Sequence, residues 1–153
     1  MGDQPDETIP VIIDSIKTTV QNQTAVLKID FNKISFGPPG KRSRIIWLVG
    51  IHETSRNLSL LKNKLEDELV KKDVRFQREK RGLGFAHITL ARFSPTQINA
   101  DIKRIDADII SVNQRIHQRE SALSFQAQSL DLMESHLKRT GAEYEILVRV
   151  NPV

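Results

Sequence analysis

The side chains best suited to chemistry are those of His87 and Thr89, in the segment Phe85–Arg92 (FAHITLAR). Successive residues of a strand point to opposite faces, so a strand here places His87 and Thr89 on one face. Ile88 and Leu90 are then expected to point into the core. An imidazole can transfer a proton near neutral pH, and a hydroxyl can donate a hydrogen bond to a phosphoryl oxygen. The pair therefore predicts a phosphate-directed site, and a solvated strand face remains the alternative.

The other three histidines lack this pattern. His52 has Thr54 two residues later, but the pair lies where a strand gives way to a helix. We interpret it as a solvated helix start in which Thr54 or Ser55 caps the helix. His117 and His136 have no hydroxyl partner two residues on and are expected at the surface.

Apolar periodicity predicts the elements that must position the motif strand. Helices are expected over Thr8–Gln21, over residues 58–69 with an end near Asp73, and from Ile98 onward with less regularity after Asp108. Strands are expected over Ala25–Phe31, Ser43–Ile51, Ala86–Arg92, Leu123–Leu137 and Glu143–Val150. Turns or loops are expected over Phe36–Gly40, Val74–Gly84 and Lys138–Gly141. Neighbouring strands joined by hairpin-type turns favour an α+β fold with antiparallel sheets over a doubly wound parallel sheet.

Composition limits the classes of protein. The chain has 153 residues, the size of a single domain covering 1–153, and 23 − 19 gives a formal net charge of +4, which suits a partner that carries phosphates. The absence of cysteine excludes disulfides, thiolate metal sites and a cysteine nucleophile. The longest apolar run, Ile45–Ile51, is too short to span a bilayer, and the polar amino terminus does not resemble a signal peptide. We therefore expect a soluble, cytoplasmic protein that does not bind membranes.

The segment Phe85–Arg92 resembles the second signature of the two-histidine phosphoesterases, specifically the LigT-like RNA 2′,3′-cyclic phosphodiesterases, also called 2′-5′ RNA ligases. Upstream, Ile34–Pro39 and Arg44–Gly50 are similar to the family's strand, proline-containing turn and tryptophan-bearing strand. Downstream, Leu132–Leu137 with Gly141 and Tyr144 is similar to its closing hairpin. These ordered matches cover most of the chain.

The resemblance implies a fold of two lobes built from antiparallel sheets with flanking helices. In the family that this segment resembles, each lobe supplies one His-x-Thr strand, and the two histidines face each other across a cleft. One histidine deprotonates water, the other protonates the departing ribose oxygen, and the threonines hold the phosphoryl oxygens. By position, His87 would be the general base and Thr89 a phosphate ligand. The resemblance implies no metal and no cofactor, and the sequence shows no group of residues with metal-ligand spacing.

Basic residues flank the predicted central strands and fit an RNA partner. Arg92 is five residues after His87, so alternation along a strand places it on the opposite face. It reaches a phosphate bound at His87 and Thr89 only if the strand ends or twists there. Arg75, Arg78 and Arg81 lie in the loop that leads into the motif strand and are predicted RNA contacts. A surface salt bridge for Arg92 and a solubilising role for the loop remain open. Trp47 and Phe36 could stack on a base, but core packing is the favoured interpretation for Trp47 because it lies in an apolar run.

The sequence contains one His-x-Thr motif of this kind. Met1–Gln4 resembles the turn after the family's first motif strand, so we expect a strand-helix-strand unit, on the order of 30 residues, to be missing. A misplaced start codon and a true loss both remain open. Loss of that unit is expected to expose the apolar face of the helix Thr8–Gln21, and the complete protein is expected to be a monomer.

Two functions follow from the motif and the resemblance. The first is metal-independent hydrolysis of RNA 2′,3′-cyclic phosphate ends, with reverse 2′-5′ ligation as a related activity. The alternative is a catalytically impaired module that binds RNA ends and retains only the second motif. A purely structural domain is disfavoured by the ordered matches.

Overall fold

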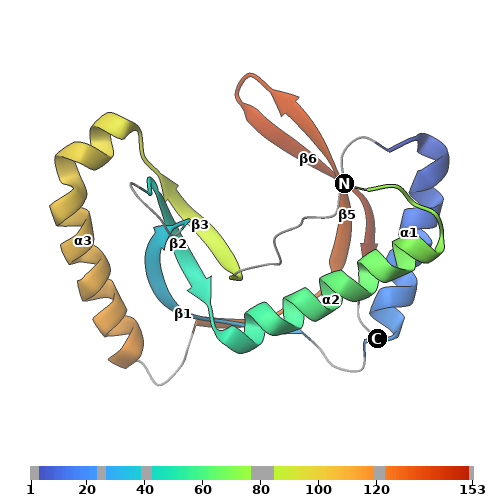
Figure 1. Cartoon of the computed structure of the whole chain (residues 1–153), viewed down its shortest axis with the longest axis horizontal. Coiled ribbons are helices and arrows are strands. Elements are labelled where there is room, and N and C mark those ends of the chain that lie inside the picture. The colour runs from blue at the N-terminus through green and yellow to red at the C-terminus, as the bar shows by residue number, and fades with distance from the viewer. Residues whose placement is uncertain (1–3, 24–26, 39–42, 77–84, 119–122, 152–153) are drawn as a thin grey trace. The chain divides into compact units, whose positions relative to one another are not determined.

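The computed structural model describes residues 4–23, 27–38, 43–76, 85–118 and 123–151 (Figure 1). A short 3-10 helix, Asp6–Thr8, precedes α1 (Ile9–Gln21). The remaining elements in chain order are β1 (Lys28–Gly37), β2 (Ile45–Gly50), α2 (His52–Lys71), β3 (His87–Arg92), α3 (Pro95–Gln118), β4 (Leu123–Gln126), β5 (Leu130–Lys138) and β6 (Gly141–Val150). The fold is α+β, as expected.

The described residues form two compact units. The first draws on the ranges Met1–Leu27, Ser59–Gly82 and Gln126–Val153, and the second on Lys28–Leu58 and Leu83–Phe125. A two-stranded antiparallel sheet, β5-β6, belongs to the first unit, and a four-stranded sheet in the order β3-β2-β1-β4 belongs to the second. Pairing of β1 with β2 and of β2 with β3 is antiparallel, so the expected strand arrangement is confirmed.

The core of the first unit is built on α1. Ile12, Ile16 and Val20 recur on one face of this helix and are 2–5% exposed, packed with Leu69 and Val74. Burying such a set stabilises a small unit by roughly 1.5–3 kcal/mol for each side chain. The expectation that the apolar face of this helix would be exposed is therefore wrong, because the end of α2 and the β5-β6 hairpin cover it.

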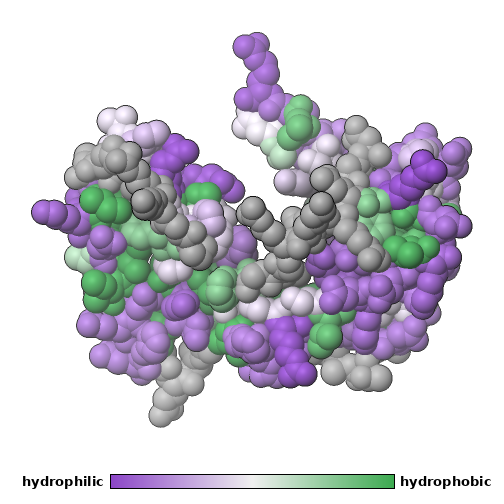
Figure 2. All heavy atoms as spheres, in the orientation of Figure 1, coloured by the Kyte–Doolittle hydropathy of each residue, from purple (hydrophilic) through white to green (hydrophobic). Residues whose placement is uncertain are grey.

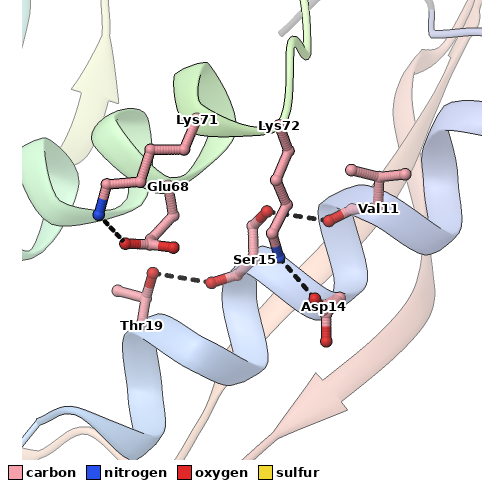
Figure 3. Close-up of polar contacts among 7 residues, drawn as sticks. All are labelled: Val11, Asp14, Ser15, Thr19, Glu68, Lys71 and Lys72. Carbon is pink, nitrogen blue, oxygen red and sulfur yellow. Dashed lines mark hydrogen bonds and ion pairs between the residues drawn. The ribbon is translucent and has the colours of Figure 1, made fainter.

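Two hydroxyls on α1 are buried with the aliphatic residues and are satisfied within the helix (Figure 3). The Ser15 hydroxyl donates to the Val11 carbonyl at 2.9 Å, and the Thr19 hydroxyl donates to the Ser15 carbonyl at 2.8 Å. On the outside, Lys72 Nζ reaches Asp14 Oδ2 at 2.5 Å. This contact joins α1 to the residue after α2 and lowers the pKa of Asp14 from its ordinary value.

In the second unit α3 lies against β1. The apolar positions of α3 that recur every three or four residues are half-buried: Ile102, Ile105, Ile109, Val112 and Ile116. Phe31 and Phe125 stack with ring centroids 6.1 Å apart and connect β1 to β4. Hydrophobic side chains also reach the surface along α3 (Figure 2), where Ile110 is 60% exposed.

Several expected boundaries change. The predicted strand Leu123–Leu137 is two strands in different sheets, because residues 127–129 leave the ladder. β1 continues through Phe36 and Gly37, which were expected in a turn, and α3 stays regular to Gln118. Ile88 and Leu90 are 45% and 50% exposed, so their expected place in the core is wrong. They lie on β3, which among the described strands pairs with β2 alone and so forms an edge of the sheet.

Candidate functional site

One face of the four-stranded sheet carries the predicted motif. In the antiparallel register, Val49 lies opposite both Lys33 and His87, and residues directly opposite each other point to the same face. The next row across the sheet is Ser35, Trp47 and Thr89. We call this surface the motif face and define it by residues 33, 35 and 37 of β1, 45, 47 and 49 of β2, and 87, 89 and 92 of β3.

A β-bulge changes the parity expected for Arg92. Trp47 pairs with Thr89, but Ile46 pairs with Ala91, so Leu90 is an extra residue on β3. One extra residue reverses the alternation beyond it. Arg92 therefore lies opposite Ile45, on the motif face with His87, rather than on the opposite face. The bulge supplies the local twist on which the sequence prediction for Arg92 depended.

Trp47 belongs to the motif face instead of the core. Its indole stacks on the His87 imidazole with centroids 3.9 Å apart and an interplanar angle of 21°. A β carbon on Gly37 would lie 2.0 Å from Trp47 Cδ2, so the indole lies directly over this glycine. Glycine at position 37 thus lets the indole lie flat on the sheet, where it supports the plane of the imidazole.

The hydrogen bond of His87 fixes the role of each ring nitrogen. Nδ1 lies 2.9 Å from the carbonyl oxygen of Phe85, and a carbonyl can only accept a hydrogen bond. Nδ1 must therefore carry the proton, and Nε2 of the neutral ring holds the free lone pair. His87 is an exposed residue, and within the described part of the chain Nε2 forms no hydrogen bond. This is the tautomer that a general base at Nε2 requires.

Two hydroxyls at the start of α2 fix the ends of the strands. Thr54 is 1% exposed, and its hydroxyl accepts the Asp30 N–H at 2.9 Å. Ser55 accepts the Ala86 N–H at 3.0 Å, immediately before the motif strand. His52 is an exposed helix start, as predicted, but Thr54 contacts β1 instead of capping the helix.

The pKa of Asp30 lies below its usual range. A hydrogen bond with the Ser124 side chain is the main cause, and Lys28, whose Nζ lies 3.2 Å from Asp30 Oδ1, adds to it. This carboxylate therefore remains charged at the end of β1 near α2, where it cannot serve as a proton donor at neutral pH.

Asn113 of α3 hydrogen-bonds the backbone of β1 at Ile34. Its side-chain amide accepts the Ile34 N–H at 2.7 Å and donates to the Ile34 carbonyl at 2.8 Å. An amide that makes both bonds acts as a short substitute for a neighbouring strand. It anchors the strand that carries Lys33 and Ser35 on either side of Ile34.

The other arginines that were predicted to contact RNA are not among the residues of the motif face. Arg75 is exposed and belongs to the first unit, where its carbonyl accepts a hydrogen bond from Gln4. Arg78 and Arg81 lie outside the described residues. His117 and His136 are exposed, as expected. The structure thus places His87, Thr89 and Arg92 on one face, and Arg75 in the other unit.

Sequence reasoning missed two groups of residues. Lys33 shares a row with His87, which only the strand register reveals. On the β5-β6 hairpin, ligand atoms of Glu134, His136 and Glu145 lie within 4.8 Å of one another, and all three side chains are exposed. The sequence showed no such group because Glu145 is brought to Glu134 by cross-strand pairing.

Comparison with known proteins identifies the fold. No protein-family model matches the chain, and no curated protein matches it. Among solved structures, the fold is similar to that of TT0787 of Thermus thermophilus, with a TM-score of 0.62 and 18% sequence identity over 99% of this chain and 73% of that chain. This likeness shows a shared fold, a mixed α+β architecture with antiparallel sheets and helices. In the described part of the chain, no helix combines the length and apolar character needed to cross a membrane.

Proposed function

We propose that this protein hydrolyses the 2′,3′-cyclic phosphate at RNA ends to a 2′-phosphomonoester, with His87 as the general base. The observation that carries the proposal is the hydrogen bond from His87 Nδ1 to the Phe85 carbonyl, which leaves Nε2 free to take a proton. The resemblance of Phe85–Arg92 to the LigT-like signature and the similarity of fold support the same chemistry. In 2′-5′ ligation a 5′-hydroxyl would take the place of water at the same groups, so that phosphorus forms a bond to the 5′ oxygen while its bond to the 3′ oxygen breaks.

The reaction has a definite assignment for each group. Nε2 of His87 removes a proton from water while the water oxygen forms a bond to phosphorus. The bond between phosphorus and the 3′ oxygen breaks, that oxygen takes a proton from solvent water, and the proton held on Nε2 then passes to solvent. The Thr89 hydroxyl donates to a phosphoryl oxygen, and Arg92, placed on the same face by the bulge, offsets the developing negative charge.

A second candidate function is binding of RNA ends without turnover. It is favoured by one observation: the motif face as described holds His87 and no second histidine that could protonate the leaving oxygen. A positioned acid or base typically contributes about 10²–10⁴ in rate, so a site with one of the two would be slow. The binding groups Thr89 and Arg92 would still be in place.

The test is hydrolysis of cytidine 2′,3′-cyclic phosphate by the full chain, with and without a chelator, followed by product chromatography. We expect turnover that is insensitive to the chelator and that falls about 10²–10⁴-fold in His87→Ala. Thr89→Val should lose less, on the order of the 1.5–3 kcal/mol of a hydrogen bond to a charged group. His117→Ala and His136→Ala are matched controls and should stay within a few-fold of the parent.

The outcomes separate the two functions. Binding of the 2′-phosphate product without turnover would leave the binding module as the correct function. Equal turnover by the parent and His87→Ala would refute the assignment of the base. Loss of activity on chelation would show that the reaction depends on a metal ion. The first residues to substitute would then be Glu134, His136 and Glu145.

A further inference from the structure

Lys33 lies on the motif face at a position suited to a second phosphate. It belongs to the row Lys33, Val49, His87, in which each residue is directly opposite the next. Opposed residues of antiparallel strands have Cα atoms about 4.5 or 5.5 Å apart, so Lys33 and His87 are roughly 10 Å apart at their Cα atoms. Val49 between them is buried, whereas both end residues are exposed.

The charge of Lys33 is available to a ligand. Among the described residues it forms no ion pair, in contrast to Lys28 on the same strand, which contacts Asp30 at 3.2 Å. Four methylenes carry its ammonium group well beyond the Cα position, so Nζ can extend over the small Val49 side chain toward His87 or away from it. The motif face therefore has a cationic side chain on each of the two strands that flank β2, Lys33 on β1 and Arg92 on β3.

We propose that Lys33 binds the phosphodiester next to the terminal phosphate held at His87 and Thr89. The site would then take the end of an oligoribonucleotide in preference to a single cyclic nucleotide. This inference rests on the proposed function, since it assumes that the terminal phosphate lies at His87. A basic residue that follows the backbone of a single strand binds without regard to base identity, so Lys33 would confer a preference for chain length and none for sequence.

The experiment compares two ligands by calorimetric titration of the full chain: cytidine 2′-monophosphate, and the dinucleotide CpC with a terminal 2′-phosphate. Both are product-like, so neither is consumed whether the chain is catalytic or not. We expect the parent to bind the dinucleotide more tightly than the mononucleotide. Lys33→Gln should weaken dinucleotide binding about 2- to 5-fold, as for an exposed ion pair, and leave mononucleotide binding unchanged.

Salt dependence identifies the contact as a phosphate. Loss of one phosphate contact to a single strand should reduce the slope of log K against log salt by about 0.7 for the dinucleotide alone. Lys33→Arg keeps the charge and should restore the preference. Lys103→Gln on α3 makes the same change in net charge at an exposed position away from the motif face and should have no effect.

Three results would overturn the proposal. An equal loss for both ligands in Lys33→Gln would place Lys33 on the terminal phosphate itself and leave the proposed function intact. No loss for either ligand would remove Lys33 from the site. Failure of the parent chain to bind either ligand would refute the proposed function together with this inference.

Discussion

Replacement of Gly37 by alanine should disrupt the stacking of the Trp47 indole on the His87 imidazole without changing His87 itself. The new β carbon would lie 2.0, 2.1 and 2.4 Å from three carbons of the Trp47 indole, where carbon atoms normally sit about 3.5–4.0 Å apart. The indole must therefore move by roughly 1.5 Å or rotate away from the sheet. Either movement breaks its stack on His87, whose centroid is 3.9 Å away.

The magnitude follows from two contributions. Forcing a methyl group into a filled space costs about 1–3 kcal/mol, and an aromatic stack contributes about 0.5–1.5 kcal/mol. We therefore expect Gly37→Ala to reduce the free energy of unfolding by about 1.5–4.5 kcal/mol, measured by urea denaturation followed by circular dichroism. The proton resonances of the His87 ring should also lose the ring-current shift from the indole.

A double-mutant cycle tests the cause. In a Trp47→Ala background the obstructing ring is absent, so Gly37→Ala should cost less than about 1 kcal/mol. If alanine at position 37 leaves both the stability and the His87 resonances of the otherwise native chain unchanged, the indole does not lie over Gly37 and the reasoning fails.

Two further substitutions test other contacts. Asn113→Ala removes both hydrogen bonds to Ile34 and should cost about 1–3 kcal/mol in urea denaturation, whereas Gln114→Ala, next to it on α3, should be near neutral; equal effects would refute this role of the Asn113 amide. The pKa of Asp131 is lowered, first by its hydrogen bonds from Arg149, so its contribution to stability is present above the unfolded-state pKa and is lost as the pH falls through the folded-state pKa. Asp131→Asn should therefore be less stable than the parent at neutral pH and should lose less stability on acidification, and parallel pH profiles would contradict the pairing.

The sequence predicted those elements whose apolar pattern is strong and local. The helix expected over Thr8–Gln21 is observed as Ile9–Gln21, and the motif strand begins one residue after its expected start at Ala86. Both have a regular period that a short window reveals. The predicted strand over Leu123–Leu137 failed because nothing in its composition marks where residues 127–129 leave one sheet for another.

The candidate site was predictable only in part. Positions His87 and Thr89 share a face by simple alternation, so the sequence sufficed for them. Arg92 depends on the bulge at Leu90, and a bulge is a property of two paired strands, which one strand's residues do not determine. The roles of Trp47 and Lys33 likewise come from the register of β2 and β1. Whether His87, Thr89 and Arg92 act on a substrate stays a prediction until the variants are measured.

The chain carries one tryptophan and one tyrosine, and they lie in different units. Trp47 is in the second unit beside His87, and Tyr144 is on the hairpin of the first. Intrinsic tryptophan emission therefore reports on the motif face, and the tyrosine contribution to the absorbance, separated from that of Trp47 by derivative spectroscopy, reports on the hairpin. A single denaturation experiment can follow the two signals separately. It therefore reveals, without an added label, whether the two units unfold together in one cooperative transition or one after the other.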